Sequence, residues 1–171
     1  NPPDPANKIS GHKDIFADPA VKTLEITGTY TINEADEFVI CNGYGEVRIQ
    51  NSEARATWYD SEWDVYYQLY KNGIALGSPK SSSTSTTHLW QNLEIGTYTV
   101  KAYRGFTTCE TTMSGSIGMV QGLITNTTQS KCYQTIQAAI DEAASGDNIS
   151  IDAGIYTETL TLSQNVTLTS G

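Results

Sequence analysis

The most regular pattern of hydrophobic and polar positions lies near the carboxyl end of the chain. Apolar residues recur there at i, i+3, i+4 and i+7, which places them on one face of a helix: Ile136, Ala139, Ile140 and Ala143. This spacing predicts a single amphipathic helix over Tyr133–Ser145. Gly146 follows it, at the position where a left-handed residue commonly ends a helix.

The residues after Gly146 alternate between apolar and polar, which is typical of β-strands. Ile149 and Ile151 alternate with polar neighbours, and Gly154 predicts a turn after them. A second alternating stretch contains Leu160, Leu162, Val166 and Leu168. We therefore expect three short strands separated by turns, which form one coil of a solenoid with the helix as its lid.

The chain from Val21 to Arg104 shows strand patterns without helical periodicity. Short apolar stretches occur at Leu24 and Ile26, Tyr30 and Ile32, Phe38–Ile40, and Val47 and Ile49. The run Val65–Tyr70 leads into Asn72-Gly73, a strong signal of a β-hairpin because both residues tolerate positive φ. Ile74 and Leu76 then belong to the return strand.

Two further strands, Leu89–Leu93 and Thr97–Arg104, flank a turn at Glu94–Gly96. About seven short strands at close spacing predict an Ig-like antiparallel β-sandwich, so the fold class is mainly β. Leu93, Gly96 and Tyr98 have the spacing of a tyrosine corner. In that arrangement a phenol hydroxyl donates to the backbone where the chain crosses between sheets.

Composition narrows the class of protein. Hydrophobic residues make up 38% of the 171 residues and charged residues only 17%, a balance typical of β-rich secreted proteins. The net charge of −9 argues against nucleic acid or an anionic membrane as a partner. No apolar run approaches the ~20 residues of a membrane helix. We expect a mature or excised segment, because its first residues, NPPDPANK, resemble no signal peptide.

These patterns divide the chain into four parts. We expect a proline-rich arm or linker over 1–20, an Ig-like β-sandwich over 21–120, and a linker over 121–132. The cap helix and first coil of a β-helix, incomplete, would occupy 133–171.

Three cysteines bear on stability. Cys41 and Cys109 bracket the first domain, and we predict a disulfide between them, since a closed loop of that length restricts the unfolded chain. Two buried free thiols are the alternative. Cys132 stands just before the helix, where it would be a small core residue or half of an intermolecular bond.

An aromatic and acidic insert at 55–64 is the main candidate for ligand contact. Aromatic rings stack on sugars, and the predicted glycan-contact residues are Trp58, Tyr59, Trp63 and Tyr66. The alternative is that these rings fill the core. Three acids in the same stretch, Asp60, Glu62 and Asp64, place oxygens at alternate positions, as calcium prefers. Solvated loop acids are the simpler interpretation, and no other cofactor is expected.

Two stretches resemble known families. The pieces TIQAAID at 135–141, SGD at 145–147 and AGIYTE at 153–158 resemble the opening of a right-handed parallel β-helix of the pectate-lyase-like superfamily. That resemblance implies architecture only, because the family's catalytic residues usually lie several coils further on. The pieces ITGTY at 26–30, CNGYG at 41–45, YQLYKNG at 67–73 and GTYTVKA at 96–102 resemble Ig-like modules of large Bacteroidetes-type secreted and cell-surface proteins.

No catalytic motif is present, and the sequence alone pairs neither His12 nor His88 with a neighbouring nucleophile or acid. We therefore predict a non-catalytic structural or adhesive module of a secreted bacterial surface protein. Its partners would be other domains or copies of the same protein, or extracellular glycans. Two alternatives stay open: a filament subunit whose coil a neighbouring chain completes, and the first part of a polysaccharide-degrading β-helix enzyme.

Overall fold

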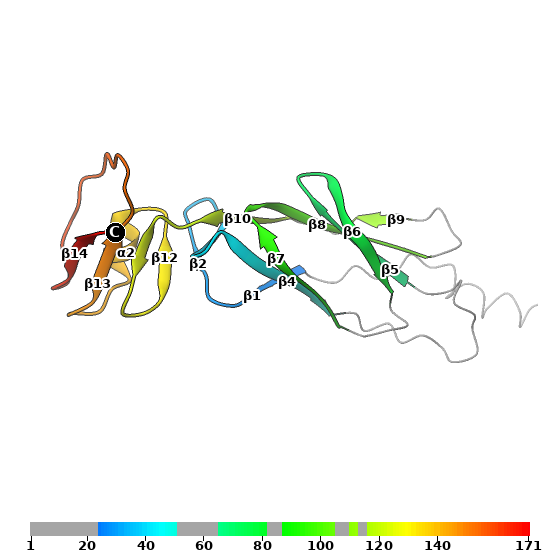
Figure 1. The fold of residues 1–171 in the computed structure, drawn as a ribbon, viewed down its shortest axis with the longest axis horizontal. Coiled ribbons are helices and arrows are strands. Elements are labelled where there is room, and N and C mark those ends of the chain that lie inside the picture. Colours follow the sequence, from blue (N-terminus) through cyan, green and yellow to red (C-terminus); the bar gives the residue numbers. More distant parts are fainter. Residues whose placement is uncertain (1–23, 51–64, 82–86, 105–109, 113–115) are drawn as a thin grey trace, which may run out of the picture. The chain divides into compact units, whose positions relative to one another are not determined.

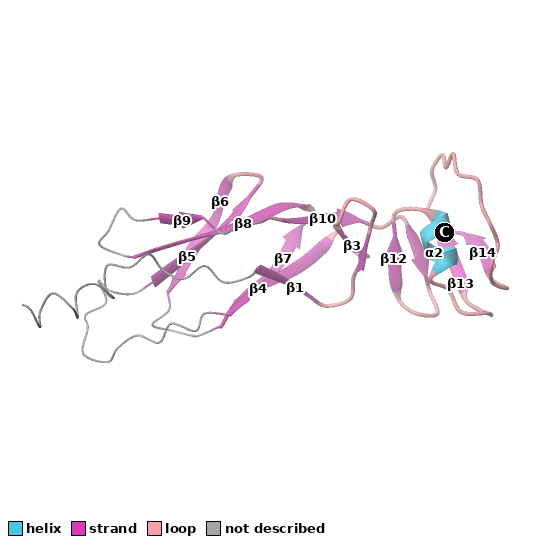
Figure 2. Ribbon diagram, turned by 180° about the vertical axis from the view of Figure 1, so that it is seen from behind, coloured by secondary structure: helices cyan, strands magenta, loops and turns pink. Residues whose placement is uncertain are grey.

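The described part of the chain is mainly β. The computed structural model describes residues 24–50, 65–81, 87–104, 110–112 and 116–171. Within these ranges strands predominate, and the short helix α2 (Ile136–Asp141) is the one helix (Figure 2). The chain divides into two compact units. The larger unit comprises 25–48, 89–98 and 116–171, and the smaller unit holds the other described residues.

Two sheets make up the first part of the larger unit. One has the order β1-β4-β7, formed by β1 (Leu24–Thr27), β4 (Tyr44–Gln50) and β7 (Thr87–Glu94). In the other, β3 (Phe38–Ile40) lies between β2 (Thr31–Ile32) and β10 (Ile117–Gln121), and β10 pairs with the start of β8 (Gly96–Arg104). The pairing of β3 with β10 is parallel, with Met119 opposite Phe38 and Gln121 opposite Ile40.

The predicted tyrosine corner is confirmed. Tyr98 is fully buried, and its hydroxyl donates to the carbonyl of Glu94 over 2.5 Å. β7 ends at Glu94 and β8 begins at Gly96, which agrees with the turn predicted at Glu94–Gly96. Gly96 takes a φ of 150°, which a side chain would disfavour.

A separate four-stranded sheet follows in the larger unit, in the order β12-β11-β13-β14 (Figure 1). Its strands are β11 (Ile124–Asn126), β12 (Lys131–Tyr133), β13 (Asn148–Ile151) and β14 (Thr167–Ser170). β13 and β14 are parallel, and each residue of β13 pairs with the residue nineteen positions later, as Asn148 does with Thr167. All of β11 and most of β12 lie in 121–132, which we expected to be a linker.

Helix α2 covers this sheet with the predicted apolar stripe. Ile136, Ala139, Ile140 and Ala143 are all buried, in one cluster with Ile124, Tyr133 and Ile149. The helix is shorter than the pattern predicted at both ends. Tyr133 belongs to β12, and the side chain of Thr135 caps the helix by accepting from Ala138 N. At the other end Glu142 is the C-cap, and its N–H bonds to Ala138 and Ile140 carbonyls.

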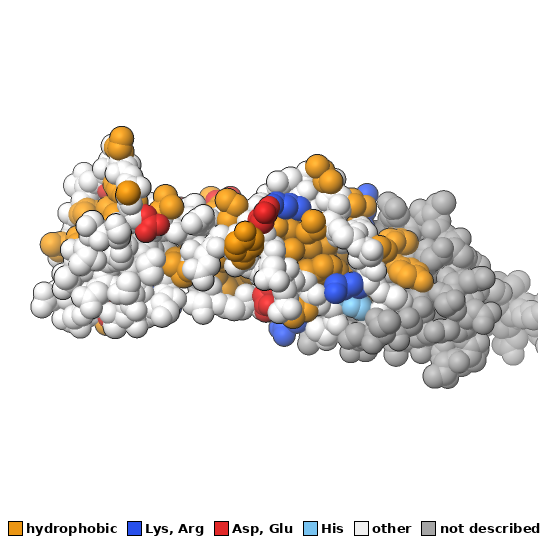
Figure 3. Space-filling model, in the orientation of Figure 1, with side chains coloured by type: hydrophobic (Ala, Val, Ile, Leu, Met, Phe, Trp, Pro, Cys, Tyr) orange, Lys and Arg blue, Asp and Glu red, His pale blue; other side chains and the backbone are white. Residues whose placement is uncertain are grey.

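The stretch between β13 and β14 is irregular where strands had been predicted around Leu160 and Leu162. Side chains hold it to the helix instead. Both carboxylate oxygens of Glu158 accept backbone N–H groups, from Ile136 and Gln137, at 3.1 Å. The Gln137 side chain also bonds both backbone groups of Thr161. Several apolar side chains remain exposed here, Ile155 almost completely, and Figure 3 shows hydrophobic atoms on this projecting stretch.

The smaller unit is built on the predicted hairpin. β5 (Val65–Lys71) pairs with β6 (Ile74–Ser81) across Asn72 and Gly73, whose φ values of 50° and 81° fit a tight turn. The register shifts between Tyr67 and Leu69. Between them, the Gln68 amide donates to the carbonyls of Leu69, Leu76 and Gly77. β9 (Glu110–Thr112) pairs with the far half of β8.

Candidate functional site

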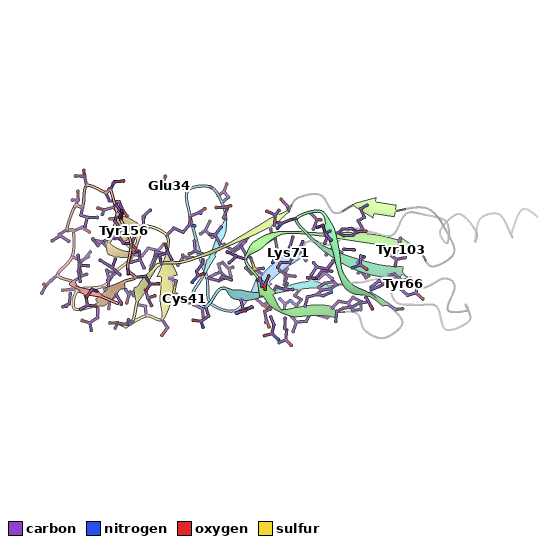
Figure 4. The ribbon with its side chains drawn as sticks, turned by 45° about the horizontal axis from the view of Figure 1, so that its top comes forward. Glu34, Cys41, Tyr66, Lys71, Tyr103 and Tyr156 are labelled. Atoms are coloured by element: carbon purple, nitrogen blue, oxygen red, sulfur yellow. A yellow bond between two sulfur atoms is a disulfide. The ribbon has the colours of Figure 1, made fainter. Side chains whose placement is uncertain are left out.

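The most distinctive feature of the larger unit is a covalent junction between its two parts. Cys41, directly after β3, forms a disulfide with Cys132 in β12, and their Cα atoms are 5.1 Å apart (Figure 4 labels Cys41). The predicted Cys41–Cys109 bridge is therefore wrong, because Cys41 has its one partner in Cys132; Cys109 lies outside the described residues. The two roles predicted for Cys132, a small core residue or half of an intermolecular bond, are both wrong, because it pairs with Cys41 of the same chain.

Hydrogen bonds surround the disulfide and join residues far apart in the sequence. The buried hydroxyl of Thr31 donates to the carbonyl of Cys132 at 2.5 Å. The Asn33 amide donates to the side-chain oxygen of Gln134 at 2.6 Å, and Gly122 N donates to the carbonyl of Ile40 at 2.9 Å. We call the residues Thr31, Asn33, Cys41, Gly122, Cys132 and Gln134 the junction.

Close packing at the junction requires a glycine. A β-carbon built on Gly122 would lie 2.6 Å from Cβ of Cys132, 2.9 Å from Cγ1 of Val39 and 3.0 Å from N of Tyr133. No side chain fits into that space without movement of the backbone. The three segments 38–41, 121–122 and 131–133 therefore approach as closely as their main chains permit.

A buried carboxylate organises the loop beside the junction. Asp147 Oδ2 accepts from the amides of Asn126 at 2.8 Å and Gln129 at 2.6 Å, and from Ala144 N at 2.9 Å. These hydrogen bonds, that of Asn126 foremost, lower the pKa of Asp147, although burial acts in the opposite direction. Asp147 therefore serves a structural role: it fixes the turn after α2 against β11.

Tyr133 connects the junction to the helix. Its ring is buried, and its hydroxyl donates to Glu142 Oε2 at 3.2 Å. Burial is the main cause of a strongly raised pKa at Tyr133, and the negative charge of Glu142 raises it further. The phenol therefore stays neutral over the physiological range, as a hydrogen-bond donor.

A groove of about 670 Å³ with a mixed polar and apolar lining lies beside the junction. It is lined by the ends of β1 and β3 and the turns after them, by β4 and β7, and by β11 and the turn after it. The lining residues are Thr27, Gly28, Thr29, Ile40, Cys41, Asn42, Tyr44, Gly45, Glu46, Gln91, Asn92, Thr125, Thr127 and Ser130. Hydrogen bonds from Thr27 and Gln91 lower the pKa of Glu46, so this carboxylate is ionised at neutral pH.

The structure brings few of the sequence-predicted site residues together. The aromatic residues Trp58, Tyr59 and Trp63 lie outside the described residues, as do the acids Asp60, Glu62 and Asp64. Tyr66 is described and stacks on Tyr103, with ring centroids 5.7 Å apart (Figure 4). Its role in glycan contact stays a prediction.

His88 is buried near the ring of Tyr67, at 5.5 Å between centroids. Burial is the main reason that the pKa of His88 is lowered, and the charge of Lys80 contributes. His88 is therefore a neutral residue of the smaller unit at physiological pH.

The described residues contain no group of three or more His, Cys, Asp or Glu side chains arranged to hold a metal ion. No helix in the described ranges has the length and apolar character needed to cross a bilayer. Comparison of the chain with family models, curated proteins and solved structures gives no match.

Proposed function

We propose that this chain is a non-catalytic structural module of a secreted bacterial surface protein, in which an Ig-like part is locked to the first coil of a β-helix. The observation that carries the proposal is the junction. One disulfide and three hydrogen bonds connect residues 31–41 with residues 122–134 of the larger unit, and these connections support a fixed orientation of its two parts. Fixed orientation is what a spacer between other domains requires.

The chemistry of the junction also supports an extracellular location. Disulfides persist in oxidising compartments and are rare in reducing ones. The parallel pairing of β13 with β14 supports the β-helix interpretation, because successive coils of such a helix pair in parallel at a nearly constant residue offset. Surface labelling of intact source cells with an amine reagent that does not cross membranes tests the location; a protein labelled only after lysis would contradict it.

Single-molecule stretching tests the mechanical role directly. Pulling on the two ends of the oxidised chain leaves the residues between Cys41 and Cys132 outside the load path, since the disulfide carries the force. The sequence separation of 91 residues corresponds to roughly 300 Å of extended chain at ~3.4 Å per residue. We expect that length to appear only after reduction, or in the double variant Cys41→Ser/Cys132→Ser. Equal extension of the oxidised and reduced chains would show that the Cys41–Cys132 disulfide does not carry the force, and would refute the proposed role.

A second role is favoured by the exposed apolar side chains of the coil. Ile155, Leu162 and Leu168 have exposed fractions of 96%, 65% and 38%. Stacking of a second copy on β14 would cover part of this surface and extend the parallel sheet, as in a filament subunit. Concentration-dependent sedimentation decides this role: regular polymers would support it, and a monomer at all concentrations would contradict it.

A further inference from the structure

We propose that the groove beside the junction is a binding site for a neutral oligosaccharide. This site is distinct from the predicted aromatic insert, and the proposal does not depend on the mechanical role of the module. The groove volume of about 670 Å³ falls within the range of small-molecule sites and would hold two or three sugar rings.

The lining of the groove selects the class of ligand. Among the described residues that line it, none is Lys or Arg, so it offers no charge partner to a phosphate, sulfate or uronic acid. The net charge of −9 opposes anionic ligands further. Nine of its fourteen lining residues carry a hydroxyl or amide group, and apolar atoms between them supply the rest of the surface, a mixture that suits the hydroxyl groups and C–H faces of a sugar. Glu46 is its one carboxylate, and both oxygens already accept hydrogen bonds, so a metal ion finds no set of ligands.

Tyr44 provides the apolar contact that a sugar needs. Its side chain lines the groove, yet 61% of its surface is exposed. An aromatic ring in this setting can pack against the C–H face of a pyranose, and its hydroxyl can bond to a ring substituent. Tyr44 is held in place by its position at the first residue of β4, directly after the turn at Gly43.

Two amide side chains supply hydrogen bonds to sugar hydroxyls. Asn42 and Asn92 both line the groove and are exposed, and neither makes a side-chain hydrogen bond to the described residues. Each amide offers two donors and one acceptor, the combination that suits a hydroxyl group. Asn92 has a left-handed backbone, with a φ of 55°, which is uncommon outside glycine and recurs at functional sites.

The opposite wall of the groove adds acceptors that are fixed in place. The hydroxyl of Thr127 donates to the carbonyl of Asn148 at 3.1 Å, and that of Thr125 lies 3.4 Å from the disulfide sulfur of Cys132, to which it can only donate. With their protons so engaged, both oxygens keep lone pairs for a ligand O–H. Cys41 itself lines the groove, so the disulfide joins its two walls.

The test is binding of the whole chain to an array of neutral and acidic oligosaccharides, followed by titration calorimetry with the best neutral ligand. We expect binding to neutral members only, and Tyr44→Ala to weaken it at least tenfold. Asn42→Ala should weaken it severalfold. Tyr44→Phe, which keeps the ring, should retain most of the affinity, and Tyr30→Ala is a control at an exposed tyrosine outside the groove.

Three outcomes would overturn the proposal: no neutral oligosaccharide bound at millimolar concentration, preference for acidic members, or unchanged affinity in Tyr44→Ala. Circular dichroism of each variant distinguishes the loss of a contact with the ligand from unfolding of the protein. Affinity lost on reduction of the disulfide, with the chain still folded, would further support a groove whose walls the bridge holds. The stretching experiment tests the mechanical role of the disulfide without any ligand. The structural role and the oligosaccharide site can therefore fail independently of each other.

Discussion

Gly122 and Cys132 approach so closely that a β-carbon on the glycine would fall 2.6 Å from the β-carbon of the cysteine. We predict that Gly122→Ala lowers the free energy of unfolding by about 1–3 kcal/mol, the usual effect of forcing a methyl group into a filled space. Denaturant unfolding followed by tryptophan fluorescence measures it. Gly118→Ala is the matched control, because the nearest atoms to its new methyl group would belong to the side chain of Glu37, which can move. Equal effects of the two substitutions would contradict the close packing.

Removal of the disulfide should destabilise the larger unit considerably. A bridge that spans 91 residues restricts the unfolded chain by up to about 4–5 kcal/mol in the loop-entropy model. We expect Cys41→Ser/Cys132→Ser to lose a large part of that, with a lower melting temperature. Peptide mapping under non-reducing conditions checks the pairing, and Cys109→Ser should leave the Cys41–Cys132 peptide intact. A recovered Cys41–Cys109 peptide would refute the described bridge.

Asp147 should make stability sensitive to acid. Its folded-state pKa is lowered by the hydrogen bonds from Asn126, Ala144 and Gln129, so its contribution is present above the unfolded-state pKa of about 4 and is lost as the pH falls through the folded value. We predict that Asp147→Asn melts at a lower temperature than the wild type at pH 7. The difference should shrink as the pH falls below about 4. A constant difference across the titration would argue against this assignment, and exposed Asp152→Asn is the control.

Tyr133 should produce the opposite dependence at alkaline pH. Its folded-state pKa is raised, mainly by burial, so its contribution to stability is complete below the unfolded-state value of about 10 and declines as the pH rises above it. We expect the stability of the wild type to fall more steeply above pH 10 than that of Tyr133→Phe. Thermal melts at several pH values measure this. Because Tyr133→Phe keeps all the other tyrosines, the difference between the two proteins reports on Tyr133 alone. Parallel curves of stability against pH for the two proteins would show that ionisation of Tyr133 does not destabilise the folded state.

Local features were predictable from the sequence. The apolar stripe of α2, the Asn72-Gly73 hairpin and the bond from Tyr98 to Glu94 follow from residues at most seven positions apart, and all three are confirmed. Asp147 stands next to Gly146, but its partner Asn126 comes from a distant strand. Periodicity carries no information about which distant strand supplies a partner.

The error in the disulfide has the same origin. Parallel pairing places Gln121 opposite Ile40, so Gly122 lies beside the end of β3, and the chain then returns through β12 to bring Cys132 to Cys41. Only a three-dimensional register decides between Cys109 and Cys132 as the partner. The strands predicted near Leu160 failed for a different reason. The carboxylate of Glu158 accepts from backbone N–H groups of the helix, and the side-chain amide of Gln137 bonds the backbone of Thr161, so this stretch is bonded to the helix and not to a neighbouring strand.

The long span of the disulfide has a consequence for how the chain reaches its native state. Synthesis begins at the amino terminus, so Cys41 and Cys109 both emerge before Cys132. A Cys41–Cys109 bond formed before Cys132 emerges would have to be exchanged once β12 appears. β3 likewise pairs with β10, where Phe38 lies opposite Met119, and Thr31 of β2 bonds to the still later Cys132; contacts between such distant residues slow folding. The sheet that contains β2 and β3 is therefore completed only when β10 is available, and a thiol-disulfide isomerase should accelerate formation of the Cys41–Cys132 bridge.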